Sequence, residues 1–166
     1  MSIKKAYNNW STQYDININP TRDLEAVALQ QVLSPLTFEA VLEIGCGTGK
    51  NTEWLMTKAS RMSCVDFSDK MLAKAKEKIN SPDVQFIQAD IKADWTFGEN
   101  AYDLTVFSLV LEHIEQLDFI FEKVAKALQP GGYVYIGELH PFKQYAGSKA
   151  RFETEEGVQV LSLIHI

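Results

Sequence analysis

Short apolar runs alternate with segments of helical periodicity along the chain, and this alternation sets the expected fold. The apolar runs of strand length are Ala40–Ile44, Met62–Asp66, Val84–Gln88, Tyr102–Phe107 and Tyr133–Ile136. Helical spacing lies between several of them, as in residues 50–59 and in Leu117–Leu128. Because this order is typical of a parallel sheet covered by helices, we expect an α/β fold with a doubly wound, mostly parallel, Rossmann-like sheet.

The N-terminal segment has a helical pattern of its own. Tyr7, Trp10 and Tyr14 are spaced so that their rings share one face of a helix. Pro20 and Thr21 open a second helix, in which Thr21 is the expected N-cap. The apolar stripe expected on this helix consists of Leu24, Val27, Ala28 and Val32.

The composition of the chain limits the class of protein and its location in the cell. The chain has 166 residues, enough for one domain with a substantial core, and a net charge of -6, which argues against sequence-blind binding to nucleic acid. No apolar run approaches the ~20 residues of a membrane span. The two cysteines, Cys46 and Cys64, do not indicate a disulfide framework, so we expect a cytoplasmic protein.

Polar residues follow the apolar runs, where a doubly wound sheet binds its ligands. The glycine-rich stretch Gly45–Gly49 follows the first run. It is not a P-loop, since Lys50-Asn51 offers no hydroxyl for magnesium, and Lys50 stands where the last glycine of a dinucleotide fingerprint would be. Taken alone, this stretch is also consistent with a tight turn.

Two acidic residues narrow the choice of ligand. Asp66 lies ~20 residues beyond the glycines, where an acid accepts hydrogen bonds from both ribose hydroxyls. Asp90 follows the third run, and a carboxylate there suits the exocyclic amine of adenine. The alternatives are a solvated strand-end acid for Asp66 and a turn or N-cap residue for Asp90.

Five segments in order resemble the class I S-adenosylmethionine-dependent methyltransferases. They are Leu42–Gly49 (LEIGCGTG), Val65–Leu72 (VDFSDKML), Gln88–Ile91 (QADI), Tyr102–His113 and Leu128–Glu138 (LQPGGYVYIGE). The resemblance extends over roughly Ala40–Pro141. It implies S-adenosylmethionine as the cofactor and no metal. The residues implied to bind the cofactor are Arg22, Glu43, Gly45, Cys46, Gly47, Asp66, Phe67, Met71, Asp90, Ile91, Ser108 and Leu109.

The resemblance also divides the chain, which we expect to be a single domain over residues 1–166. Residues 1–35 resemble the helical lid of small-molecule methyltransferases, and residues 36–166 form the cofactor-binding core. Arg22 is implied to pair with the cofactor carboxylate, unless it is a surface arginine.

Two residues are candidates for a catalytic role. Tyr14 is a candidate to face the methyl group, unless it is a core aromatic. His140 is a candidate acid–base or substrate contact, unless it forms a turn before Pro141. A histidine at the position of His113, after the fourth apolar run, more often caps or orients the loop there than takes part in catalysis.

The family usually has seven strands, whereas this sequence has room for five and part of a sixth at Gly157–Ile166. We therefore expect a fold without its last strands and a C-terminally truncated chain. The exposed sheet edge then predicts a homodimer through this edge, strand exchange or poor solubility.

The expected function is methyl transfer from S-adenosylmethionine to a small-molecule acceptor, without nucleic-acid or membrane partners. Aminopropyl transfer on the same scaffold and a cofactor-binding module without turnover stay open. A nicotinamide-dependent oxidoreductase is disfavoured by the glycine spacing and by Asp90.

Overall fold

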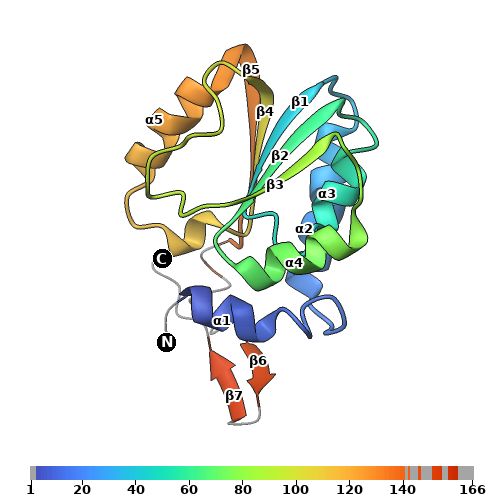
Figure 1. The fold of residues 1–166 in the computed structure, drawn as a ribbon. Helices are drawn as coiled ribbons and strands as arrows, with labels where there is room; N and C mark the ends of the chain where they lie inside the picture. Colours follow the sequence, from blue (N-terminus) through green and yellow to red (C-terminus); the bar gives the residue numbers. More distant parts are fainter. Residues whose placement is uncertain (1–2, 141, 143–145, 147–150, 155–156, 161–166) are drawn as a thin grey trace.

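The computed structural model describes residues 3–140, 142, 146, 151–154 and 157–160. Its centre is a five-stranded sheet with the strand order β3-β2-β1-β4-β5 (Figure 1). The strands are β1 Ala40–Ile44, β2 Arg61–Asp66, β3 Val84–Gln88, β4 Tyr102–Ser108 and β5 Leu128–Gly137. All pairings in this sheet are parallel, so the expected doubly wound sheet is confirmed.

Helices cover both faces of the sheet. They are α1 Ile3–Trp10, α2 Pro20–Leu33, α3 Lys50–Leu55, α4 Asp69–Lys78 and α5 Leu117–Ala127, with a short 3-10 turn η1 at Leu111–His113. The helices α2, α3 and α4 lie on one face and α5 on the other, while α1 lies beyond the carboxyl ends of the strands (Figure 1). Within the described part of the chain, none of these helices has the length and apolarity to cross a membrane.

The central strand β1 supplies side chains to two cores. Val41 belongs to the buried cluster that includes Leu29 of α2. Leu42, its neighbour, belongs to the cluster that includes Ile120 of α5. Because successive strand residues point to opposite faces, Glu43 shares the face of Val41 and lies within an apolar core.

The helix α4 begins as its sequence indicates. Ser68 is the N-cap, and its side chain accepts a hydrogen bond from the backbone N–H of Met71. Met71, Leu72 and Ala75 are buried and form the apolar face of the helix. This cap fixes the start of α4 directly after the end of β2.

The expected phase of α2 is wrong. Asn19, not Thr21, is the N-cap, and its side chain accepts from the backbone N–H of Arg22. Three of the four residues expected in the stripe are exposed, namely Leu24 at 70%, Val27 at 51% and Val32 at 55%. The buried residues are Arg22, Glu25, Ala26, Leu29 and Leu33. Two of these buried residues are charged. The prediction assumed an apolar buried side, and it therefore assigned the exposed side of the helix to the core.

The segment between α5 and the last strand of the sheet also differs from expectation. The apolar run Tyr133–Ile136 predicts a strand that begins at Tyr133. Instead β5 starts at Leu128, directly after α5. A register shift in the pairing with β4 between Tyr102 and Leu104 accommodates this stretch, in which Gly131 has a φ of 84°.

The C-terminal residues form a separate hairpin. β6 Arg151–Thr154 pairs antiparallel with β7 Gly157–Val160. The expected strand is therefore confirmed over Gly157–Val160, but it does not join the five-stranded sheet. Residues 161–166 lie outside the described residues. That the chain is a truncated form stays a prediction.

Candidate functional site

The glycine loop (Gly45–Gly49) turns the chain from β1 into α3. Gly45, Gly47 and Gly49 have φ values of 73°, 55° and 82°, a region that side chains disfavour. At Gly45 space matters as well, because a Cβ atom there would lie 2.2 Å from Cγ2 of Val110. The loop therefore offers bare backbone at the end of β1.

Asp66, at the end of β2, holds this loop in place. One carboxylate oxygen accepts from the backbone N–H of Gly47 at 2.9 Å, and the other accepts from the N–H of Ser68 at 2.7 Å. Burial raises the pKa of Asp66, while these backbone hydrogen bonds lower it. Asp66 therefore stabilises the glycine loop and also lines the cavity beside it.

An open hollow of about 860 Å³, a volume that includes open solvent, lies at the carboxyl ends of the strands and is bounded on one side by α1. Its walls come from α1, the glycine loop and the segments that follow β2, β3 and β4. The predicted site residues that line it are Tyr14, Gly45, Gly47, Asp66, Phe67, Met71, Asp90, Ile91, Ser108 and Leu109.

A smaller hollow of about 380 Å³ adjoins the other side of the glycine loop. It adds three predicted residues, Arg22, Glu43 and Cys46. His140 lines neither hollow; it is exposed, and its Nδ1 accepts from the backbone N–H of Phe142 at 3.2 Å. The structure brings together every predicted site residue except His140, and the roles of all of them stay predictions.

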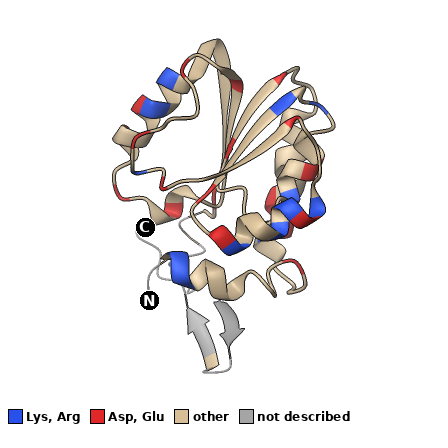
Figure 2. Ribbon diagram, viewed as in Figure 1, with Lys and Arg blue, Asp and Glu red and all other residues tan. Residues whose placement is uncertain are grey.

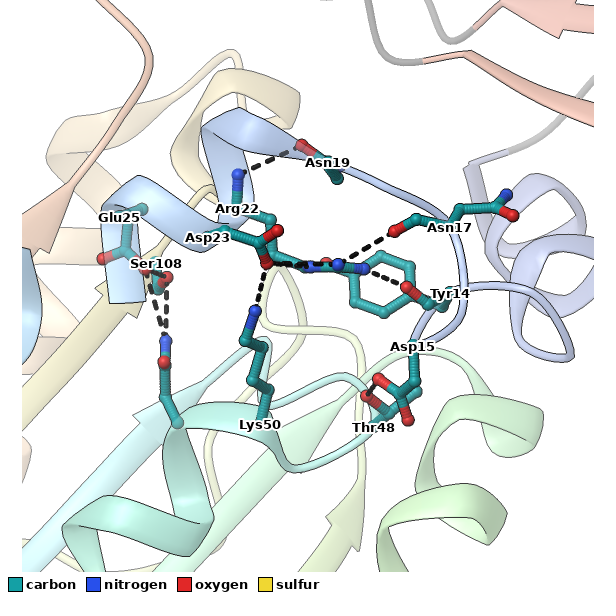
Figure 3. Close-up of polar contacts among 11 residues, drawn as sticks. Tyr14, Asp15, Asn17, Asn19, Arg22, Asp23, Glu25, Thr48, Lys50 and Ser108 are labelled. Carbon is teal, nitrogen blue, oxygen red and sulfur yellow. Dashed lines mark hydrogen bonds and ion pairs between the residues drawn. The ribbon is translucent and has the colours of Figure 1, made fainter. Parts of the chain in front are cut away.

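Arg22 organises the connecting segment (residues 11–19) between α1 and α2 (Figure 3). It is buried, and its guanidinium donates to the backbone carbonyls of Tyr14 and, at 3.0 Å, Asn17. It also pairs with Asp23 at 3.1 Å and stacks on the ring of Tyr14 at 5.3 Å. Burial raises the pKa of Tyr14 to about 12.

Polar contacts join the connecting segment to the core (Figure 3). The hydroxyl of Thr48, in the glycine loop, donates to Asp15 at 2.6 Å. Lys78 of α4 pairs with the other oxygen of Asp15 at 2.9 Å. Lys50 pairs with Asp23 of α2. The connecting segment is therefore linked to the glycine loop and to α4, and α2 is linked to the start of α3.

Two acids of the site have contrasting surroundings. Glu43 is buried among apolar side chains, and burial raises its pKa to about 7. It accepts from the hydroxyl of Thr52 at 2.5 Å. Asp90 is only partly buried and accepts from the backbone N–H of Lys92 at 3.0 Å, so it forms a turn and lines the cavity at once.

Tyr7 and His113 are cavity residues that the sequence did not indicate as a pair. The hydroxyl of Tyr7 lies 2.9 Å from Nε2 of His113, and the rings meet edge to face at 5.7 Å. Burial lowers the pKa of His113. The sequence predicted one helix face for Tyr7, Trp10 and Tyr14, but α1 ends at Trp10 and Tyr14 lies in the turn that follows, although Tyr7 and Tyr14 pack against one cluster. The partner on η1 was not predicted.

Glu25 is a further residue of the smaller hollow that the sequence did not indicate. Its carboxylate accepts from the hydroxyl of Ser108, from Asn51 at 3.3 Å and from the hydroxyl of Tyr135 at 3.0 Å. A Cβ atom at Gly137 would lie 2.3 Å from its Oε1. No local pattern around Glu25 signals these partners, since each lies on another element.

Comparison with known proteins agrees with this geometry. The family model described as "Methyltransferase domain" matches residues 42–136. The malonyl-[acyl-carrier protein] O-methyltransferase of Priestia megaterium is 30% identical over 159 residues, which cover 89% of this chain and 57% of that protein. The demethylmenaquinone methyltransferase of Clavibacter sepedonicus is 25% identical over 138 residues, which cover 82% of this chain and 55% of that protein.

A solved structure is similar over most of the chain. The complex of DhpI with S-adenosylhomocysteine has a TM-score of 0.75 and 27% identity, and the match covers 96% of this chain and 77% of that one. This chain spans little more than half the length of the two curated relatives above. The family match, the parallel sheet and the loop-and-acid geometry place the chain in the class I S-adenosylmethionine-dependent methyltransferase family.

Proposed function

We propose that the protein transfers a methyl group from S-adenosylmethionine to a small-molecule acceptor. One observation carries the proposal: Asp66 is hydrogen-bonded to the glycine loop at Gly47, beside a cavity that Asp90 also lines. An acid after β2 suits a ribose, and an acid after β3 suits an adenine amine. Relatives named as methyltransferases support the same reaction.

The chemistry of the cavity fits the cofactor. Asp66 lines the cavity while it accepts backbone hydrogen bonds from Gly47 and Ser68, and its carboxylate is proposed to accept from a ribose hydroxyl as well. Arg22, in the smaller hollow, is proposed to pair with the carboxylate end of the cofactor.

The bound cofactor supplies a methyl group that its positively charged sulfur already activates. The remaining tasks of the chain are to align the acceptor and to exclude water. Tyr14 has a pKa of about 12 and stays a neutral phenol near pH 7, so we propose that it contributes its ring or hydroxyl and not a base. His140 is proposed to act on acceptors that must lose a proton.

The proposed partners follow from charge and surface. Basic and acidic residues are interspersed over α4 and α5 (Figure 2), which supports a small acceptor over nucleic acid. The exposed edge of β5 supports a homodimer. Cys46 and Cys64 are unpaired thiols, which is consistent with the proposed cytoplasmic location.

The single-domain division is also part of the proposal. Residues 1–35 are proposed to act as the lid, which agrees with the position of α1 beside the cavity, and residues 36–166 as the core.

Thermal shift measurements test this function. We expect S-adenosylmethionine and S-adenosylhomocysteine to raise the melting temperature of the full chain, and NAD to leave it unchanged. Stabilisation by NAD alone would overturn the proposal.

Turnover is tested separately with a panel of hydroxyl, carboxyl, amine and carbon acceptors, by following the formation of S-adenosylhomocysteine. Binding without turnover on any acceptor would favour a cofactor-binding module. Formation of methylthioadenosine from the decarboxylated cofactor would indicate aminopropyl transfer.

A further inference from the structure

The turn after β4 (residues 108–111, the β4 turn) has an unusual backbone. Leu109 has a φ of 56°, and Asn100 is the only other non-glycine residue of positive φ in the described part of the chain. A bulky side chain disfavours this region, so such a conformation persists only where neighbouring groups hold it. One such contact is the backbone N–H of Leu109, which donates to the carbonyl of Gly137 at 2.8 Å.

The carboxylate of Glu138 holds the next two residues of the turn. Its Oε1 accepts from the backbone N–H of Val110 at 2.9 Å and from that of Leu111 at 2.7 Å. These two N–H groups stand at the start of η1, where a helical turn leaves its donors without backbone partners. The second oxygen, Oε2, is buried and has no hydrogen-bond partner among the described residues.

The β4 turn forms a wall of the cavity. Ser108, Leu109 and Val110 line it on the side of the glycine loop. The side chain of Val110 fills the space that Gly45 leaves by lacking a Cβ atom. A displacement of the β4 turn would therefore change the distance between this wall and the glycine loop.

We propose that Glu138 is a positioning residue for cofactor binding. It acts through the β4 turn: one oxygen of its carboxyl group accepts from the N–H groups of Val110 and Leu111 and so fixes the wall that faces the glycine loop. The inference rests on the proposed function, because the ligand that this wall meets is the proposed cofactor. Holding the β4 turn requires an acceptor oxygen at the end of a side chain as long as that of glutamate. It does not require the negative charge.

Three substitutions separate reach from charge. Glu138→Gln keeps an oxygen at the same distance, Glu138→Asp keeps the charge but shortens the side chain, and Glu138→Ala removes both. Calorimetric titration with S-adenosylhomocysteine should give a dissociation constant within about 3-fold of wild type for Gln, and about 10-fold or more weaker for Asp and Ala. Glu115→Ala, an exposed glutamate beyond η1, is the matched control and should bind as wild type.

Amide hydrogen exchange of the ligand-free protein gives an independent reading. Protection at Val110 and Leu111 should be kept in Glu138→Gln and lost in Glu138→Asp and Glu138→Ala. If one of the variants Glu138→Asp and Glu138→Ala fails to fold, the other still tests whether protection is lost.

Binding by Glu138→Asp as tight as wild type, together with weak binding by Glu138→Gln, would overturn the proposal. So would unchanged exchange and unchanged binding in a folded Glu138→Ala. Absence of binding by the wild type would contradict the proposed function instead, and the exchange data would still decide whether Glu138 holds the β4 turn.

Discussion

Asp66 combines two interactions in one side chain. Its oxygens accept from the backbone N–H groups of Gly47 and Ser68, and the residue also lines the cavity. Loss of the carboxylate would remove the proposed contact to the ribose and would also release the glycine loop. The two effects act in the same direction on cofactor affinity.

Asp66→Ala is therefore expected to weaken binding of S-adenosylhomocysteine by about 1–3 kcal/mol, through the loss of a charge-assisted acceptor. Calorimetric titration measures this change. Asp83→Ala, at an exposed acid in the turn before β3, is the control and should bind normally. An unchanged affinity in Asp66→Ala would refute the ribose assignment.

Glu43 should impose a pH dependence on stability. Its pKa is raised from 4.5 to about 7 by burial, so the folded state holds a proton that the unfolded state releases. The stabilisation is complete below pH 4.5 and is lost as the pH rises through about 7. We expect Glu43→Gln to remove this loss, so that its melting temperature falls less than that of wild type between pH 5 and 8.

Melting curves at several pH values in that interval test the effect. Parallel pH profiles of wild type and Glu43→Gln would contradict it. The measurement is made without cofactor, because bound cationic groups near Glu43 would shift its titration.

The strand-end acids and the glycine loop were predictable from the sequence, since each directly follows an apolar run of the chain. Glu25, Glu138 and Tyr7 were not, because their roles arise from partners on distant segments. A motif within one segment carries information about backbone shape, whereas a contact between segments appears only when the sheet order is known.

Among the elements, α2 shows the limit of apolar periodicity. Its phase was wrong because Arg22 and Glu25 occupy the buried side, where they bond to the connecting segment and to the strand ends. Leu24 and Val27 are exposed in consequence. The helix α5 buries mainly apolar residues, and its position, expected at Leu117–Leu128, was predicted correctly.

The connecting segment should open more readily when Asp15 is changed. Asp15 meets both Thr48 and Lys78, so Asp15→Ala cuts the link from the segment to the glycine loop and to α4. We expect the dissociation constant of S-adenosylhomocysteine to rise roughly 2- to 5-fold, as befits a partly exposed pair.

Lys74→Ala is the matched control, since it breaks the exposed pair with Glu77 on the same helix. It should leave binding unchanged. Equal effects of the two variants would show that general destabilisation of α4, and not the Asp15 link, is responsible.

At the scale of the whole molecule, the outer edge of β5 is the surface that we expect to mediate association between copies. Tyr133, Val134 and Ile136 are exposed at 50%, 42% and 46%, and no strand in the described part of the chain pairs with this edge. An apolar, unpaired edge favours association between copies.

Sedimentation velocity at increasing protein concentration tests the proposed homodimer. We expect Ile136→Lys to shift the wild-type equilibrium toward the monomer, because a lysine on an edge strand opposes pairing. Val27→Lys, on the exposed side of α2, is the control. If Val27→Lys abolishes association and Ile136→Lys does not, the interface lies on α2.

The central position of β1 has a consequence for synthesis of the chain on the ribosome. β1 pairs with β2, about one helix further along, but its other neighbour β4 ends only at Ser108. The carboxylate of Asp103 completes this junction by accepting from the backbone N–H groups of Glu39 and Ala40. Such distant pairing is slow, because a long loop must close first. The nascent chain therefore carries a strand that the folded protein buries completely with one edge unpaired until some sixty further residues have been added. Exposed apolar surface and an unpaired strand edge make such an intermediate prone to aggregation.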